Sequence, residues 1–583
     1  MQPKKFYLYI ILLSALAYGN TLKNGFVLDD DVVFLQNRYV QEGISAIPDI
    51  LSHGFLYGFN ERNDQSYRPL VLIDFAIQKS FFGNNPTVLH FFNVLYFSIL
   101  CCLLFYFLKQ LFRKSSPWIA FFITLLFVLH PIHTEVVANI KGRDELIHAI
   151  FLLGSFVAAF KSIDTKNKTW LAVSIISFFM ALLSKEMAIT YLGLLPLSVW
   201  FFRSINLRQL VKLMLPYGAV LLAYFLIRNA ILDTITFEDK MTVINNTLAA
   251  ANSLPERIAT NLIIFANYIK LLFYPHPLAW DYSYPHFRIV SFNEPIVILI
   301  GIALLVLGVL AIFGIKSKNK FAFTFLFFIV SFSIVSNFFI LIGSTLGERF
   351  LFFPSIAFCI FIVLFIQWIL DKLKYKKQVR TLGLGVLAIG LLYAAKTISR
   401  NQEWKSNLTL FESGVKATPN NSRAISALAS AYRNRAEAAK NQEIKLQNYN
   451  LAKTGYQKSV ALYPKNTDSW YNLGVVQMNI DERKQAKKAF RRTIELDPYH
   501  ISARNNLGVI YFQNKNFQAA AEQFRNCLKI NNNFQSAYAN LGAVYHNLGD
   551  YDQARTNYNK ALALNPSDQT SLNNLQRLPT ENN

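Results

Sequence analysis

Long apolar segments recur through the first 400 residues of the chain and are absent from the remainder. They have 16 to 21 residues, close to the length of about 17–25 residues at which a helix crosses a hydrocarbon core of ~30 Å. The pattern predicts eleven membrane-spanning helices, at 6–22, 88–108, 117–133, 145–160, 169–184, 187–202, 212–227, 295–315, 321–341, 350–370 and 381–396. One more apolar segment, 258–273, is a candidate. If it crossed the membrane, the basic loops would no longer all fall on one side. We therefore expect it to lie at the membrane interface or to re-enter.

A second pattern occupies the C-terminal part of the chain. A Leu-Gly pair returns every 34 residues, at 473–474, 507–508 and 541–542, and an aromatic residue follows each pair. This period is typical of tetratricopeptide (TPR) helix–turn–helix repeats. We predict four repeats after a connecting half-repeat at 401–421 and before a cap and tail at 569–583. The predicted repeats are 422–466, which is 11 residues longer than the others, and 467–500, 501–534 and 535–568.

The predicted fold class is therefore all-α, with a polytopic membrane bundle over 1–400 followed by a TPR solenoid. A solenoid of this kind offers a concave surface for a protein or peptide partner. The alternative is a generic helical repeat that binds no partner. The sequence does not identify the peptide.

Composition supports a membrane protein and argues against two other classes. Of 583 residues, 53% are apolar and only 16% are charged, which excludes a disordered chain and disfavours a wholly soluble one. The net charge of +23 lies largely in short loops between apolar segments, so we expect no nucleic-acid partner. The four cysteines are too few and too badly spaced for a disulfide framework or a zinc site.

The distribution of lysine and arginine predicts the orientation. If the N-terminus is cytoplasmic, every short basic loop falls on the cytoplasmic side. These loops contain Lys109, Arg113, Lys114, Lys161, Lys166, Lys168, Arg203, Arg208, Lys316, Lys318, Lys320, Lys372, Lys374, Lys376, Lys377 and Arg380. Eleven crossings then place the TPR domain outside the cytoplasm. Lys4 and Lys5 precede the first apolar segment without a cleavage site after it, so we expect a retained anchor.

The opposite side collects ionisable residues in the external loops 23–87 and 229–294 and at the ends of spans. Such residues are costly near a membrane and by default suggest function. The set comprises Asp29, Asp30, Asp31, Arg68, His130, His133, Glu135, Arg143, Glu145, Lys185, Glu186, Asp281, Tyr282, Tyr284, Glu348 and Arg349. For any single member, helix capping or a structural ion pair is a comparable explanation. Asp31 is a possible cap, and Arg143 a possible partner of Glu135 or Glu145.

Together these groups suit glycosyl transfer from a lipid-linked donor. A carboxylate deprotonates an acceptor hydroxyl, and cations stabilise the departing phosphate. A transporter would require charges at the bilayer midplane and internal symmetry, and neither is seen. His130 and His133 form a weak metal pair, and we expect hydrogen-bonding roles for them. No metal and no firm cofactor are indicated.

The motifs in order resemble those of the transmembrane-and-TPR (TMTC) proteins, O-mannosyltransferases with a GT-C type membrane fold. The matching stretches include 26–30, 66–70, 90–94, 130–135, 142–145, 184–186, 281–284, 336–337, 348–355 and 403–404. The resemblance implies transfer of mannose from a polyprenyl-phosphate carrier to Ser or Thr hydroxyls of proteins on the extracytoplasmic face. That face is the periplasmic side of a bacterial inner membrane, or the ER lumen in a eukaryote.

The resemblance also assigns roles to residues. Asp29 and Asp30 are the catalytic acidic pair, with Asp31 extending the run. Arg68, Arg143, Lys185 and Arg349 bind the donor phosphate. The remaining pocket residues are Asp31, His130, His133, Glu135, Glu145, Glu186, Asp281, Tyr282, Tyr284 and Glu348. Two alternatives stay open: a lipid-linked glycan ligase or oligosaccharyltransferase, and a non-enzymatic membrane-anchored TPR scaffold.

Overall fold

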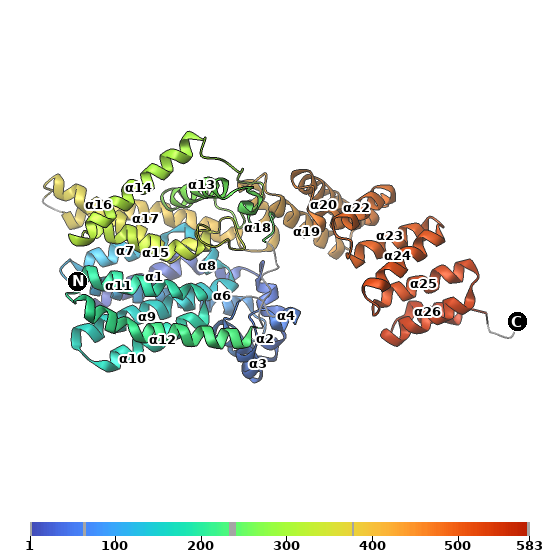
Figure 1. Cartoon of the computed structure of the whole chain (residues 1–583), viewed down its shortest axis with the longest axis horizontal. Coiled ribbons are helices and arrows are strands. Elements are labelled where there is room, and N and C mark those ends of the chain that lie inside the picture. The colour runs from blue at the N-terminus through green and yellow to red at the C-terminus, as the bar shows by residue number, and fades with distance from the viewer. Residues whose placement is uncertain (1–2, 62–65, 233–240, 376–377, 580–583) are drawn as a thin grey trace. The chain divides into compact units, whose positions relative to one another are not determined.

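A computed structural model describes residues 3–61, 66–232, 241–375 and 378–579. The chain forms two compact units, Met1–Pro419 and Asn420–Asn583. All regular elements of the described residues are helical, as the sequence predicts (Figure 1). Lys376 and Lys377 of a predicted basic loop lie outside the described residues, as do 62–65 and 233–240 of the external loops and 580–583 of the tail.

Among its described residues, the first unit contains six helices that are long and apolar enough to cross a membrane, or seven if one bent pair is a single span. The six are α6 (Pro86–Leu111), α9 (Arg143–Thr165) with the preceding 3₁₀ turn η5 (Ile140–Gly142), α12 (Leu207–Ile231), α14 (Pro295–Lys316), α16 (Ser355–Lys372) and α17 (Gln378–Glu403). The bent pair joins α7 (Pro117–Leu129) at 54° to η4 (Pro131–His133) and α8 (Thr134–Ala138). This chain is therefore a multi-pass integral membrane protein.

The prediction of about eleven spans is not confirmed, because four of the predicted segments form helices of only 12 to 17 residues. These are α1 (Pro3–Tyr18), α10 (Lys168–Ser184), α11 (Tyr191–Phe202) after η6 (Glu186–Thr190), and α15 (Lys320–Phe332) before η8 (Ser333–Val335). The reason is local for three of them. Lys185 is extended and interrupts the segment between α10 and η6, and 3₁₀ turns occupy part of the apolar stretches beside α11 and α15. Hydrophobicity alone does not reveal such interruptions.

The apolar segment near residue 258 forms α13 (Leu254–Phe273). In the described residues, α13 is not one of the helices that are long and apolar enough to cross a membrane. Its buried face, which includes Ala259 and Leu262, packs against Val290 and Val297 at the start of α14. This amphipathic packing agrees with an interfacial helix better than with a lipid-facing span.

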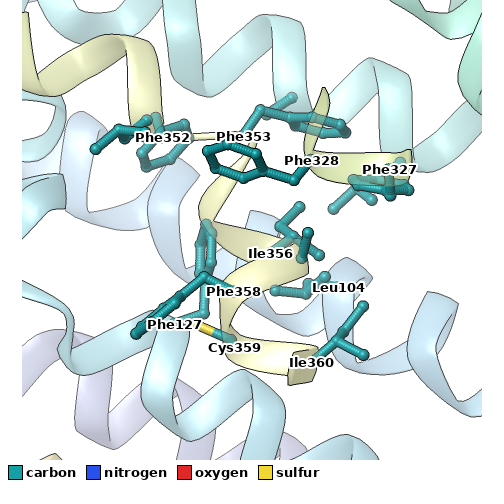
Figure 2. Close-up of a cluster of buried hydrophobic side chains, with 14 of the residues drawn as sticks. Leu104, Phe127, Phe327, Phe328, Phe352, Phe353, Ile356, Phe358, Cys359 and Ile360 are labelled. Carbon is teal, nitrogen blue, oxygen red and sulfur yellow. The ribbon is translucent and has the colours of Figure 1, made fainter. Parts of the chain in front are cut away.

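Phenylalanine side chains hold the spans together around the start of α16 (Figure 2). The ring of Phe352 lies 5.6 Å from that of Phe127 on α7, and Phe353 lies 6.0 Å from Phe327 on α15. Cys359 and Ile360 are fully buried below them. This packing fixes the short 3₁₀ turn η9 (Glu348–Leu351) that precedes α16 and carries two of the predicted site residues.

The first external loop contains short helices rather than open chain. They are η1 (Gly19–Lys23), the π-helical turn η2 (Asp31–Leu35), α2 (Arg38–Glu42), η3 (Gly43–Ala46), α3 (Ile47–Ser52), α4 (Tyr57–Asn60) and α5 (Pro69–Phe82). Phe34 packs edge-on against Phe75, with 5.6 Å between ring centroids, and Ile140 of η5 belongs to the same core. The loop is thereby attached to the start of α9.

Two further elements complete the first unit. The 3₁₀ turn η7 (Thr247–Ala250) lies in the second external segment. The helix α18 (Asn407–Ala417) comes from the predicted half-repeat, and its Phe411 ring lies 5.1 Å from that of Trp280. The boundary between the units therefore follows this helix, at 419/420.

In the second unit, each of the four predicted repeats contains a pair of helices. The pairs are α19 (Ser422–Ala438) and α20 (Gln442–Leu462), α21 (Thr467–Asn479) and α22 (Arg483–Leu496), α23 (Ile501–Gln513) and α24 (Phe517–Ile530), and α25 (Gln535–Leu548) and α26 (Tyr551–Leu564), followed by α27 (Gln569–Gln576). Gly508 shows why the Leu-Gly pair recurs. A Cβ at this position would lie 2.6 Å from the Phe524 ring, so only glycine permits this approach.

Candidate active site

A buried carboxylate, Asp144, is the centre of a charged cluster at the start of α9. Its Oδ2 atom lies 2.7 Å from Nη1 of Arg68, 3.1 Å from Nζ of Lys185 and 3.4 Å from Nζ of Lys141. The side chain of Asp144 is only 1% exposed. The three cations come from the segment before α5, from η5 and from the junction of α10 and η6, so this carboxylate ties together segments far apart in the sequence.

Two more carboxylates complete the cluster. Arg68 donates through Nε and Nη2 to both oxygens of Glu186, at 3.0 and 2.5 Å, and Lys185 donates to Glu145 at 2.7 Å. Burial lowers the pKa of Arg68, but the carboxylates of Glu186 and Asp144 outweigh it and raise that pKa above its ordinary value. Because the nitrogens of Arg68 and Lys185 already have carboxylate partners, these two residues hold the cluster together.

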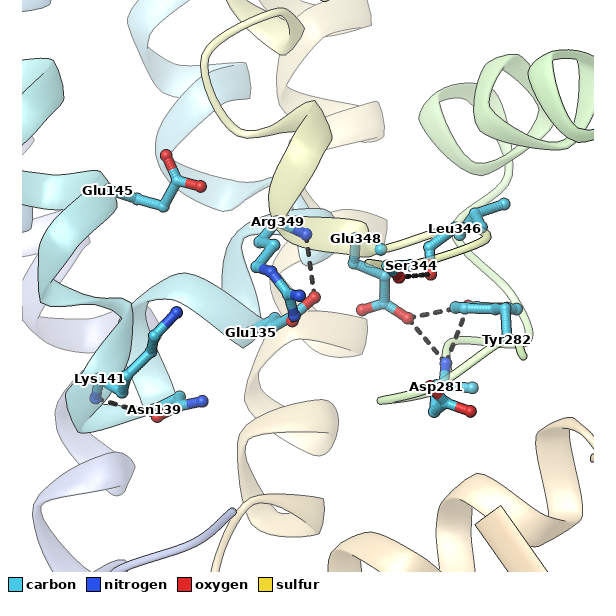
Figure 3. A network of polar contacts seen from close by, with 12 residues as sticks. Glu135, Asn139, Lys141, Glu145, Asp281, Tyr282, Ser344, Leu346, Glu348 and Arg349 are labelled. Carbon is cyan, nitrogen blue, oxygen red and sulfur yellow. Dashed lines mark hydrogen bonds and ion pairs between the residues drawn. The ribbon is translucent and has the colours of Figure 1, made fainter. Parts of the chain in front are cut away.

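Arg349 on η9 has a different environment. Its backbone N–H and its Nη1 donate to the two oxygens of Glu135, at 2.9 and 2.5 Å, and its side chain is 34% exposed (Figure 3). Within the described part of the chain, neither Nε nor Nη2 of Arg349 makes a hydrogen bond. Burial lowers its pKa, but Glu135 and then Asp29 raise that pKa above its ordinary value, which means that the Asp29 carboxylate lies within electrostatic reach.

The predicted acidic run 29–31 divides into three environments. Asp30 is 1% exposed, and its carboxylate accepts hydrogen bonds from the backbone N–H groups of Val27 at 3.0 Å and Lys141 at 2.8 Å. Burial raises the pKa of Asp30 to about 7 despite these two hydrogen bonds. Asp29 is exposed, and Asp31 is half-buried at the start of η2, which no side chain caps. Asp30 therefore positions the loop, and Asp29 is the most exposed of the three.

Arg143 is separate from the cluster. It is fully buried and donates to Asp74 at 2.9 Å, Asn93 at 2.9 Å, Gln78 at 2.6 Å and the carbonyl of Leu89 at 2.6 Å. The alternative partners expected from the sequence, Glu135 and Glu145, are not its partners in the structure. The arginine joins α5 to α6, and its Nε, Nη1 and Nη2 are all occupied.

His130 and His133 are fully buried at the bend between α7 and α8. Nε2 of His130 lies 2.9 Å from the carbonyl oxygen of Leu272, and its Nδ1 accepts from the N–H of Ile132 at 3.2 Å. Nε2 of His133 lies 2.8 Å from the Ser355 hydroxyl. Both therefore make hydrogen bonds within the protein, as expected, and connect this bend to α13 and α16.

Glu348 faces away from Arg349 toward a second polar group (Figure 3). Its Oε1 accepts from the Tyr282 hydroxyl at 2.9 Å and from the N–H of Ala279 at 2.7 Å, and lies 3.6 Å from Nη2 of Arg400. Burial raises the pKa of Glu348 to about 7. Asp281 accepts from the hydroxyl and the N–H of Ser283, and Tyr284 is half-buried nearby in the sequence. This group closes the segment 279–284 against η9.

The structure adds three charged residues that the sequence did not single out, Lys141, Asp74 and Arg400. Lys141 is 16% exposed and its only ion pair among the described residues is the 3.4 Å contact with Asp144. A spacing of three residues between Lys141 and Asp144 across a helix start is a signal that could have been used. Asp74 and Arg400 lie inside apolar helices, where an isolated charge is itself the signal.

No group of three or more His, Cys, Asp and Glu side chains among residues 3–61, 66–232, 241–375 and 378–579 is arranged to hold a metal ion. Asp29, Arg349 and Lys141 are charged residues of this region that keep some exposure, and the buried cluster lies beside them. An exposed carboxylate beside cations with free donors suits proton removal next to a bound anion.

Comparisons with known proteins match both units. Family models of the tetratricopeptide repeat match residues 477–531 and 536–568. Protein O-mannosyl-transferase TMTC3 of Mus musculus is 26% identical over 512 residues, which cover 82% of this chain and 53% of that protein. Protein O-mannosyl-transferase F38B6.6 of Caenorhabditis elegans is 29% identical over 427 residues, covering 71% of this chain and 58% of that protein.

Among solved structures, MamA matches 30% of this chain and 94% of its own, at 24% identity and a TM-score of 0.25. The chain spans about half the length of the curated relatives it matches. It is a distant homologue of the TMTC protein O-mannosyl-transferases, with tetratricopeptide repeats in its C-terminal part.

Proposed function

We propose that this protein is a membrane O-mannosyltransferase that moves mannose from a polyprenyl-phosphate carrier to Ser or Thr hydroxyls of protein acceptors. The distant homology supports the class of reaction. The proposal rests on Arg349, a partly exposed guanidinium at the end of a span whose Nε and Nη2 make no hydrogen bond among the described residues, and on Asp29, an exposed carboxylate that contributes to raising the pKa of Arg349. A lipid-linked donor presents its phosphate and sugar at this depth.

In the proposed reaction, the Asp29 carboxylate takes the proton of the acceptor hydroxyl. The hydroxyl oxygen then forms a bond to C1 of the sugar, and the bond between C1 and the phosphate oxygen breaks. The phosphate gains negative charge as it leaves, and Arg349 and Lys141 stabilise that charge. Their effect is strong because water is largely excluded near Asp144 and Glu135.

The other predicted residues support this centre. Arg68 and Lys185 keep Asp144 and the ends of α9 and α10 in place, and Asp30 fixes the backbone of Lys141. Arg143 positions α5 against α6. We assign the donor phosphate to Arg349 and Lys141 first, because they retain exposure and unpaired donors.

The topology is part of the proposal. The four shorter helices α1, α10, α11 and α15 cross with the seven longer candidates, giving eleven spans with a cytoplasmic N-terminus. This arrangement puts the charged cluster and the TPR unit on the extracytoplasmic side. The TPR unit then binds acceptor proteins or partners through its concave surface, as such repeats generally do.

The decisive experiment is transfer by the purified full chain from a synthetic polyprenyl-phosphate mannose to Ser/Thr peptides. Asp29→Asn keeps the size of the side chain and removes the base, and we expect a loss of about 10²–10⁴-fold. Asp31→Asn is the matched control, because it removes the same charge two residues away, and we expect nearly parental transfer. Parental activity in Asp29→Asn, or equal losses in both variants, would contradict the assignment of the base.

A further inference from the structure

A polar cavity of about 690 Å³ lies at the opposite end of α9 from the charged cluster. It is formed where α9 turns into α10 and where the segment after α11 enters α12. Asp144 lies near the start of α9 and Asp164 near its end, which at 1.5 Å per residue separates the two sites by about 30 Å. Because that distance equals the thickness of a hydrocarbon core, the cavity belongs to the other membrane surface.

Five hydrogen-bond donor groups line this cavity without partners in the described part of the chain. They are the ammonium groups of Lys166 and Lys212, the hydroxyls of Ser162 and Ser204, and the side-chain amide nitrogen of Gln209. The only carboxylate in the lining, Asp164, is already neutralised: it accepts from Nε and Nη2 of Arg203 at 2.9 and 3.2 Å, and Arg113 pairs with it as well. The cavity therefore keeps a net positive charge with unused donors.

The apolar surroundings indicate the class of ligand. The walls of the cavity are Ile163, Leu171, Ile205 and Leu213. Apolar walls of this kind around a basic cavity fit the acyl chains of a lipid better than a water-soluble anion.

Aromatic and basic side chains place the cavity at headgroup level. Lys161 lies over the ring of Trp170 at 4.1 Å, and Lys318 lies over the ring of Trp200 at 5.8 Å. Tryptophan concentrates at the membrane–water interface, and basic pockets between spans are suited to anionic headgroups.

We propose that this cavity binds the phosphate of an anionic glycerophospholipid, with the acyl chains against Leu171 and Leu213. Lys166 and Lys212 supply the charge, and Ser162 and Ser204 donate hydrogen bonds to the phosphate oxygens. This site is independent of the proposed transferase activity, since it rests on residues about 30 Å from the charged cluster.

The test is native mass spectrometry of the purified full chain in neutral detergent, titrated with phosphatidylglycerol or with phosphatidylcholine of the same acyl chains. The parent is expected to bind phosphatidylglycerol more tightly than phosphatidylcholine. Lys166→Gln with Lys212→Gln should weaken that binding about 30-fold, because each lysine near a membrane contributes about fivefold. Lys166→Arg with Lys212→Arg retains the charge and should bind as the parent does.

The matched control is Lys372→Gln with Lys374→Gln. It removes the same charge from lysines in another of the basic loops, and Lys374, like Lys166, has a positive φ, at 51° and 55°. This control should keep parental binding. Three results would each overturn the proposal: no preference of the parent for phosphatidylglycerol, an equal loss in the control, or parental binding by the double glutamine variant. Equally tight binding of glycerol 1-phosphate would show that the ligand is a soluble phosphate instead.

Discussion

The two units use charged residues in opposite ways. In the membrane unit, Arg143 is fully buried and its hydrogen bonds to Asp74, Asn93 and Gln78 join two helices. In the repeat unit, Arg492 pairs with Glu495 of the same helix, and the two side chains are 40% and 62% exposed. Fully buried charge therefore joins helices in the first unit, whereas ion pairs of the second unit stay partly exposed, including the one that joins Lys453 to Glu482 of the next repeat at 2.7 Å.

This contrast bears on function. A buried charge that lost its partner would be costly, so the membrane unit can keep only charges that are paired or used. Arg349 stands out because it is charged, near the membrane and only partly paired. In the repeat unit exposed charges cost little, so a single exposed arginine there is a weak indication of a site.

The largest effect should come from breaking a buried pair. Arg143→Met leaves Asp74 without its arginine, and we expect the free energy of unfolding in detergent to fall by about 3–5 kcal/mol. Thermal unfolding of the purified chain measures this change. Arg492→Met in the repeat unit is the counterpart and should change stability by less than about 1 kcal/mol. Similar losses in both variants would contradict the difference between the units.

Shape should be the sensitive property of the repeat unit. Gly508→Ala brings a Cβ within 2.6 Å of the Phe524 ring, and we expect a loss of about 1–3 kcal/mol. Limited proteolysis should show the cleavage sites appearing in 420–579, with the membrane unit intact. Gly385→Ala on α17 is the control, because a Cβ there meets nothing within 4 Å. If Gly508→Ala unfolds no more readily than Gly385→Ala, the close approach of residue 508 to Phe524 does not determine the stability of the repeat unit.

A charge-conserving change separates binding from structure within the membrane unit. Arg349→Lys keeps the charge but removes the planar fork that holds a phosphate through two hydrogen bonds. We expect transfer to fall by about tenfold or more, with weaker binding of the lipid donor and nearly parental thermal stability. Donor titration of the purified enzyme measures both parameters. A loss of stability without loss of donor affinity would show that Arg349 only anchors Glu135.

The smallest predicted effect is a pH dependence of stability. The pKa of Asp30 is raised by burial to about 7, so its stabilising contribution is present at low pH and is lost as pH rises through 7. Between pH 6 and 8 the expected loss is about 1 kcal/mol. Asp30→Asn does not titrate, and its stability should fall less over this range. An identical pH profile for Asp30→Asn and the parent would show that the carboxyl does not titrate there.

The sequence by itself determined the features that depend on local patterns. Apolar length predicted the long spans, and the period of 34 residues placed the boundaries of the repeat helices near 467, 501 and 535, because helix formation and neighbour packing repeat with the chain. The order of the short motifs along the chain indicated homology to the TMTC proteins. Local patterns were less successful where 3₁₀ turns replaced α-helix in part of the predicted spans 187–202 and 321–341.

Only the tertiary structure decided the roles of individual charges. Asp29 and Asp30 are neighbours in the sequence, but one is exposed and the other is buried because Asp30 accepts from Lys141, 111 residues away. In the same way, Arg143 is paired with Asp74, 69 residues away, and Arg349 with Glu135, 214 residues away. Whether a charge is occupied depends on such distant partners, and burial by distant segments sets its pKa. A single sequence carries no record of either.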